Sequence, residues 1–221
     1  MIIVLTLIST LTIISLNYAL DLEDSVPLPT FPLQFSANIL ITSHLVDANS
    51  EYPPRTRNMA VYYDYKAKKA RADIEGGYEA AKYYIRRYDT KNEYMIRLPP
   101  IDDCKRSYLG EEMPYPDISD VTYMGIARIH SRDCNYYLAE DYNTRVHIYM
   151  SSVDGSPVQL VEESTENNES TPLLTYDYSD VELGAPSSEW FELPPQYDKK
   201  SCLRHIGGFP YLHIFHYFVR F

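Results

Sequence analysis

Glycine and basic residues are scarce in this sequence, and each shortage excludes a class of function. Glycine occurs 8 times in 221 residues, with neither a glycine-rich phosphate-binding loop nor a GxSxG nucleophile motif. Lysine and arginine number 20 against 31 acidic residues, which gives a formal net charge of −11 with no basic cluster to offset it. This charge disfavours nucleic-acid backbones and anionic membrane surfaces as partners, and it favours solubility.

Long helical patterns are also hard to find, whereas tyrosine is abundant. The chain has 22 tyrosines and is 45% hydrophobic, a globular composition for one domain of ordinary size. Tyrosine suits half-wet sheet surfaces because its ring packs while its hydroxyl reaches water. About nine short strands follow one another in hairpins, and Asp154-Gly155 marks one tight turn. The predicted fold class is mainly β, an antiparallel, curved sheet that is open or partly closed into a barrel.

The two ends of the chain differ from its centre. Residues 1–20 form an uncharged apolar run that is short for a membrane span, and we predict a cleavable signal peptide rather than a signal anchor. Residues 21–34 are acidic and rich in proline, which indicates an extended lead-in to a β domain over residues 35–205. Residues 206–221 are apolar, as in a final buried strand or, by slight preference, a chain cut short of its natural end. We expect a secreted protein, extracellular or in the endolysosomal lumen.

Secretion makes the three cysteines candidates for oxidation. Cys104 and Cys134 flank a predicted strand and are the preferred pair, although spacing alone does not fix the pairing. Closing that loop stabilises the fold by about 3 kcal/mol on the chain-entropy account. Cys202 is then left as a free thiol, an intermolecular link, or the partner of a cysteine outside this chain.

Histidines and cysteines form no convincing catalytic or metal site. His213 and His216, with His205 nearby, are three residues apart, a spacing that gathers ligands on a helix but separates them on the strand expected here. A thiol nucleophile needs a lowered pKa, and the sequences around Cys104 and Cys202 match no protease signature. We therefore predict a protein that is not an enzyme and uses no metal or cofactor.

Two polar segments are interpreted as surface features. Asn168 begins an Asn-Glu-Ser sequon in a polar loop and is a predicted glycosylation site in a secreted chain. Four carboxylates lack the alternating oxygen ligands of a calcium loop and are interpreted as a solvated acidic face: Asp102, Asp103, Glu111 and Glu112.

An ordered set of short motifs resembles a known class of domain. Residues 61–65 (VYYDY) and 70–73 (ARAD) form an aromatic strand, a turn and an Arg-x-Asp strand, followed downstream by 123–125 (YMG), 153–158 (VDGSPV) and 191–194 (FELP). Over roughly residues 35–205 this order resembles secreted LolA-like (lipoprotein-carrier-like) domains, including ependymin-related proteins. It is also similar to the region ahead of the papain-like domain in counting-factor-associated cysteine proteases.

The resemblance implies a half-barrel around a hydrophobic cavity, one or two short helices across its mouth, and binding of lipid or another apolar ligand. The Cys-His-Asn machinery of the papain-like domain is absent from this chain. Alternation along a strand turns only about half of the aromatic residues inward. The candidate lining residues are Val61, Tyr63, Tyr65, Tyr83 and Ile85.

The first functional hypothesis is therefore a secreted binding module that holds a lipid-like ligand in a curved sheet, although an ordinary core would fill the same space. A second is an accessory region or pro-region of a secreted cysteine protease or other hydrolase, held to a protein partner through the apolar segment 206–221. A third is a structural or adhesive extracellular protein, with Asn168 glycosylated and Cys202 linking chains.

Overall fold

The computed structural model describes residues 30–47, 49, 55–76, 80–116, 118, 120–165 and 170–209. In these ranges there are twelve strands, and the only helical segment is a four-residue 3-10 turn, η2 (Ser188–Phe191). The prediction of a mainly β, antiparallel, strongly curved sheet is confirmed. No helix in the same ranges is long and apolar enough to cross a membrane. The predicted signal peptide (residues 1–20), the predicted glycosylation site Asn168 and residues 210–221 lie outside the described residues.

The first half of the sheet is a continuous antiparallel meander, in which each strand pairs with the next. The tyrosine-rich segment before residue 88 is a strand rather than a helix, as its β-branched and aromatic content predicts. The six strands are β1 (Gln34–Ser43), β2 (Thr56–Asp64), β3 (Lys69–Ile74), β4 (Lys82–Arg87), β5 (Asn92–Arg97) and β6 (Asp103–Tyr108).

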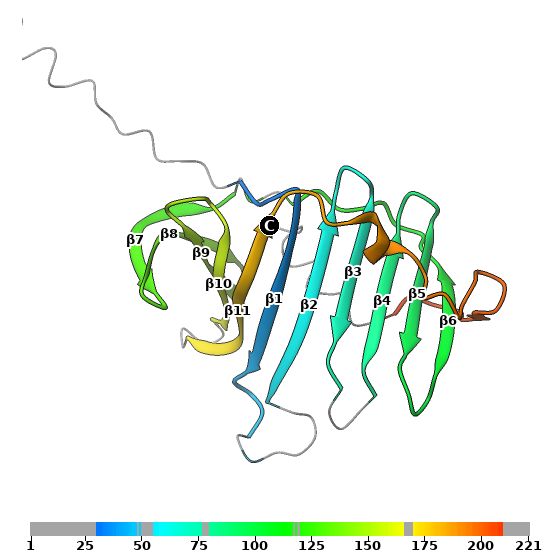
Figure 1. Ribbon diagram of the computed structural model, residues 1–221. Coiled ribbons are helices and arrows are strands. Elements are labelled where there is room, and N and C mark those ends of the chain that lie inside the picture. Colours follow the sequence, from blue (N-terminus) through cyan, green and yellow to red (C-terminus); the bar gives the residue numbers. More distant parts are fainter. Residues whose placement is uncertain are drawn as a thin grey trace, which may run out of the picture.

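A second antiparallel meander forms the other half (Figure 1). Its strands are β7 (Thr122–Ile129), β8 (Arg132–Asp141), β9 (Thr144–Ser151), β10 (Pro157–Ser164) and β11 (Thr171–Leu183). The predicted Asp-Gly turn joins β9 to β10, where Gly155 has a φ of +70° and donates its N–H to the carbonyl of Ser151.

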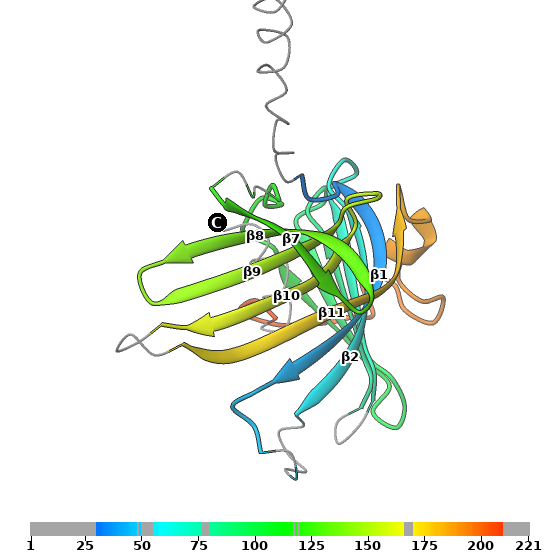
Figure 2. The ribbon, with the colours of Figure 1, turned by 90° about the vertical axis from the view of Figure 1, so that its left-hand side faces the viewer.

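Pairing of β1 with β11 joins the two meanders into one sheet of order β12-β6-β5-β4-β3-β2-β1-β11-β10-β9-β8-β7. The short β12 (Leu203–Arg204) adds to β6 in parallel. Figure 2 shows that the strands of the two meanders are turned toward one another, which gives the sheet a concave and a convex face. Because side chains alternate along a strand, neighbouring residues serve opposite faces.

The convex face of β2–β5 is covered by the segment that follows β11. Trp190 stacks on Tyr62 with ring centroids 4.2 Å apart, and its carbonyl accepts a hydrogen bond from Arg71. Leu193 and Tyr197 pack against a smaller buried cluster on this side, made of Ile85, Tyr94, Ile96, Cys104 and Cys202. The molecule therefore has a second, minor core outside its main one.

The disulfide joins Cys104 to Cys202, and Cys134 is a buried free cysteine. The predicted Cys104–Cys134 pair and the unpaired Cys202 are both wrong. The register of β12 on β6 sets Leu203 opposite Lys105, so that Cys202 arrives beside Cys104 with a Cα–Cα distance of 4.6 Å. Cys134 belongs to β8, near the far end of the sheet, and is out of reach.

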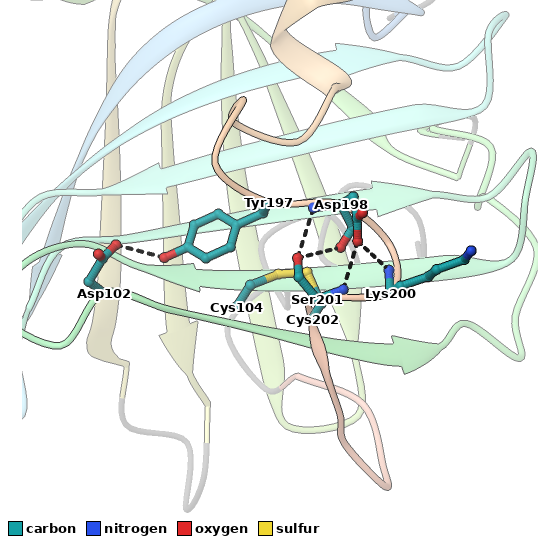
Figure 3. The surroundings of a disulfide bond; sticks show 7 residues. All are labelled: Asp102, Cys104, Tyr197, Asp198, Lys200, Ser201 and Cys202. Carbon is teal, nitrogen blue, oxygen red and sulfur yellow. Dashed lines mark hydrogen bonds between the residues drawn. A yellow bond between two sulfur atoms is a disulfide. The ribbon is translucent and has the colours of Figure 1, made fainter.

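Local hydrogen bonds fix the turn that presents Cys202 (Figure 3). The carboxylate of Asp198 accepts the backbone N–H groups of Lys200 and Ser201, each at 2.7 Å. Tyr197 donates its hydroxyl to Asp102 at 2.7 Å, which ties the same turn to the start of β6. The disulfide thus fastens the convex cover to the edge of the sheet.

Replacing both bonded cysteines with serine tests this connectivity. The bond spans 98 residues of sequence, and opening a loop of that length is expected to lower the free energy of unfolding by about 2–5 kcal/mol, measured by urea denaturation. Cys134→Ser is the matched control and should leave the Cys104–Cys202 peptide intact in a non-reducing peptide map. A map that shows Cys104 bonded to Cys134 would contradict the structure.

Candidate functional site: the covered concave face

The five predicted lining residues divide between the two faces. Val61 and Tyr63 lie in the main core on the concave side, and Tyr65 packs against it. Tyr83 and Ile85 belong to the convex side, where they contribute to the minor core. On β4 it is Tyr84, opposite Ala72 of β3, that faces inward, so its two neighbours face outward.

The concave face is a continuous apolar surface contributed by both meanders. Its floor at β3 consists of Ala70 and Ala72, which are buried. Larger side chains surround them from strands on either side of the β1–β11 pair: Phe35, Ile39, Met59, Val61, Tyr84, Tyr137, Ile148, Leu160, Tyr176 and Tyr178. The apolar chemistry of these side chains suits an apolar occupant.

An irregular segment of this chain, made of the described residues 109–116 and 118, covers part of this face, and we call it the covering strap. It connects β6 with β7, which lie near opposite ends of the sheet, and the burial of its apolar residues in the main core places it on the concave side. Leu109, Met113 and Ile118 are buried in the main core. Its described residues have no regular secondary structure, and the helices implied across the mouth have no counterpart there.

Few directional contacts hold the covering strap to the sheet. Tyr63 donates its hydroxyl to the carbonyl of Pro114 at 3.1 Å. The Tyr65 and Tyr115 rings meet edge to face with centroids 5.2 Å apart. At one end, the N–H of Leu109 bonds to a carbonyl of the β4–β5 turn at 3.1 Å. These contacts act together with the packing of Leu109, Met113 and Ile118 in the main core.

A charged cluster interrupts the apolar face at β4 and β5. Arg86 and Glu93 are opposite one another in the register, and both side chains are buried. The Arg86 Nη1 donates to Glu111 of the covering strap at 2.8 Å and to the Tyr88 hydroxyl at 3.2 Å. Glu93 Oε1 accepts the backbone N–H of Phe209 at 3.1 Å. The cluster links the sheet, the covering strap and the end of the described chain.

The contact between Arg86 and Glu93 is one of charge rather than an aligned hydrogen bond. Arg86 Nε lies 3.4 Å from Glu93 Oε2, and neither atom has a hydrogen-bond partner among the described residues. Burial raises the pKa of Glu93, an effect that the neighbouring Arg86 opposes. Burying a charge costs desolvation free energy that only full pairing offsets. This incompletely paired site therefore stabilises the fold less than an apolar pair would.

The predicted acidic face is divided among separate contacts. Asp103 pairs with Arg97, whose hydrogen bonds hold the pKa of that carboxyl below its usual value. Glu111 binds Arg86, while Glu112 is exposed. His205 stacks on Phe209, and His213 and His216 lie outside the described residues. Among the described residues, no group of three His, Cys, Asp or Glu side chains is placed to hold a metal ion.

The convex face carries an open groove of about 600 Å³ at the ends of β1–β4. Tyr83 lines this groove, beside Asp73, which Arg71 holds through two hydrogen bonds of 2.6 and 2.8 Å. The other polar side chains are Asn38, Asn58, Glu75 and Ser179. Apolar residues such as Leu40, Ile74 and Leu98 also line the groove, so its surface is mixed, whereas the concave face is mainly apolar.

Comparison with known proteins supports the fold of this chain and does not identify its family or function. No family model and no curated protein matches this chain. An uncharacterized conserved protein from Thermus thermophilus shares the fold, with a TM-score of 0.53 at 11% identity over 79% of this chain and 91% of that one. The open, curved antiparallel sheet agrees with the half-barrel expected from the sequence, and at these identities the likeness concerns the fold alone. No comparison links the chain to ependymin-related proteins or to the proteases.

Two weaker likenesses are to Pseudomonas aeruginosa structures. A chain of the MucA/MucB complex aligns with a TM-score of 0.47 at 10% identity, over 73% of this chain and 56% of that one. A chain of MucB in complex with MucA(peri) gives 0.44 at 9% identity, over 74% and 55%. This protein thus spans just over half the length of either chain.

Substituting Glu93 with glutamine is expected to change the pH dependence of stability. A carboxyl whose folded-state pKa is raised holds its proton more tightly when folded, so its ionisation destabilises the fold as pH rises from the unfolded pKa, near 4.5, through the folded one. Wild type should therefore lose stability relative to Glu93→Gln as pH rises through that window, in urea denaturation at a series of pH values. A difference between the two proteins that stays constant above pH 4.5 would contradict the assignment.

Proposed function

We propose that this protein is a secreted, non-enzymatic binding module whose concave face holds an apolar, lipid-like ligand. One observation carries the proposal: among the described residues, an apolar face built by two meanders is covered by an irregular strap and not by a second sheet or a helical layer. A cover without regular hydrogen bonding is the kind of segment that opens locally while the rest of a protein stays folded.

Energetics favour exchange between the covering strap and a ligand. Full burial of a large aliphatic side chain is worth about 1.5–3 kcal/mol, and three such residues of the strap insert into the face: Leu109, Met113 and Ile118. A hydrocarbon chain of similar area restores the burial that the face loses when these side chains leave. Opening is therefore opposed mainly by contacts that the ligand itself can replace.

Topology allows the covering strap to move without breaking the sheet. The strap connects β6 to β7. The ladder hydrogen bonds of β6 are made with β5 and β12, those of β7 are made with β8, and they do not involve the strap. Between its ends, the hydrogen bond from Tyr63 to Pro114 and the contact of Arg86 with Glu111 are side-chain anchors of the strap, and both can be released without breaking the sheet. A connection of this length can swing outward as a loop.

The alternative functions have less support in the described residues. The adhesive hypothesis relies on Cys202 as a link between chains, but Cys202 is bonded to Cys104 within the same chain. The hypothesis of an accessory region or pro-region relies on the apolar segment 206–221, of which residues 210–221 lie outside the described residues. The binding-module hypothesis relies instead on a face whose strands are all described.

The test is uptake of a neutral long-chain ester carrying a pyrene group by delipidated protein, followed by fluorescence. We expect saturable binding, and we expect Tyr63→Phe to bind about fivefold faster, because it removes a hydrogen bond worth about 1 kcal/mol from the closed strap. Tyr62→Phe is the matched control on the other face of the same strand and should bind at the wild-type rate.

Hydrogen exchange provides the second readout of the same experiment. Ligand binding should change the exchange of amides in residues 109–116 while leaving β2 and β3 protected, since only the covering strap moves. Failure of the delipidated wild-type protein to take up the probe would reject the proposal.

A further inference from the structure

We infer that the apolar ligand carries an anionic head group, which binds Arg86 in place of the Glu111 carboxylate. This inference rests on the proposed function and deepens it, because it names the polar half of the ligand. The head group is a carboxylate or a phosphate, two groups that offer an arginine the same kind of charged oxygen acceptor.

The position of Arg86 is difficult to explain by stability alone. Its side chain is 6% exposed and lies on the face that otherwise forms the main apolar core. A buried ion pair is often no more stabilising than a well-packed apolar pair of the same volume. Within the part of the chain that the structure describes, the Arg86 Nε also lacks a hydrogen-bond partner. A buried guanidinium with unused donor capacity on a ligand-binding face is consistent with a role in recognition.

The partners of Arg86 differ in how firmly they are held. Glu93 belongs to the neighbouring strand, is 2% exposed and stays with the sheet. Glu111 belongs to the covering strap, has a 44% exposed side chain and contacts Arg86 Nη1 at 2.8 Å. When the strap opens, Glu111 leaves and Glu93 remains. Opening therefore uncovers the donors that a new anion would use.

Charge balance selects the head group. In the closed form Arg86 contacts two carboxylates, Glu93 and Glu111. Exchanging the Glu111 carboxylate for that of a ligand leaves the number of charges at this buried site unchanged. A neutral head group would leave the Nη1 donor without its charged acceptor in a low-dielectric setting, which costs more than the same loss in water.

The surroundings of Arg86 also give the ligand a direction. The exposure of Glu111 shows that this part of the face is reached from solvent, so the head group would sit at the rim. Tyr84, two residues earlier on the same strand and face, is buried in the main core. A tail attached to a head group at Arg86 would therefore pass over Tyr84 onto the apolar floor.

The experiment titrates delipidated protein with oleate and with methyl oleate, which have the same tail. We expect oleate to bind about tenfold more tightly, as a charge-assisted hydrogen bond requires. Glu111→Gln should tighten both ligands by a similar factor, since either must displace this side chain. Glu112→Gln removes the same charge from an exposed neighbour and should change neither affinity.

The double variant Arg86→Met/Glu93→Gln removes the buried charges together, so that no unpaired charge is left in the core. It should lose the preference for oleate over methyl oleate. Retention of the preference in this variant would overturn the assignment to Arg86. Should the double variant fail to fold in urea denaturation, the comparison of Glu111→Gln with Glu112→Gln decides: equal affinities in these two variants would overturn the role of Glu111.

The possible outcomes separate this inference from the proposed function. Equal affinity of wild type for oleate and methyl oleate would overturn the head-group inference and leave the apolar-ligand proposal standing. Binding of neither would overturn both. A parallel titration with lysophosphatidic acid distinguishes the sources: tighter binding than oleate supports a phosphate head group, and weaker binding supports a carboxylate.

Discussion

Pairing between β1 and β11 is the contact on which the rest of the structure depends. Neither meander has a second layer of its own, and each would expose one apolar face to water if it stood alone. Their union sets Ile39 opposite Tyr178 and Ile41 opposite Tyr176, so that the two apolar faces become one. It also sends β6 and β7 toward opposite ends of the sheet, and their connection buries its apolar side chains on the concave side.

The two covers of the sheet differ in how they are attached. The convex cover is fixed by the Cys104–Cys202 bond and by the stacking of Trp190 on Tyr62. The covering strap on the concave side has no covalent tie in the described residues and relies on packing and a few polar contacts. Under the proposed function this asymmetry is useful, because the concave side would open while the convex cover keeps the strands in place.

The charged cluster on the concave face illustrates how stability and recognition oppose each other. A fully apolar face would pack better, and it would also accept any hydrophobic molecule of the right size. Arg86 contacts Glu93 on the neighbouring strand and Glu111 on the covering strap. Under the further inference, a ligand must supply an anionic group at this one position of the face. A buried group that must be paired in every state gives selectivity at the expense of stability.

The sequence by itself determined the strands and the tight turns, because both follow from neighbouring residues. Alternation and aromatic content were sufficient for the β2–β3 hairpin, and the Asp154-Gly155 pair was sufficient for the turn after β9. The polar sequence of β6 gave no comparable signal, and that strand exists because β5 pairs with it. Local patterns say that a segment is extended, but not which strand lies beside it.

Only the tertiary structure decided which distant residues meet. Three of the five predicted lining residues reach the concave face, because alternation along a strand does not say which set of side chains faces inward. The partner of Cys104 is 98 residues away and follows from the register of β12 on β6. The meeting of Arg86 with Glu111 likewise depends on the path of the covering strap. Such contacts are set by the pairing of whole strands, which no short stretch of sequence encodes.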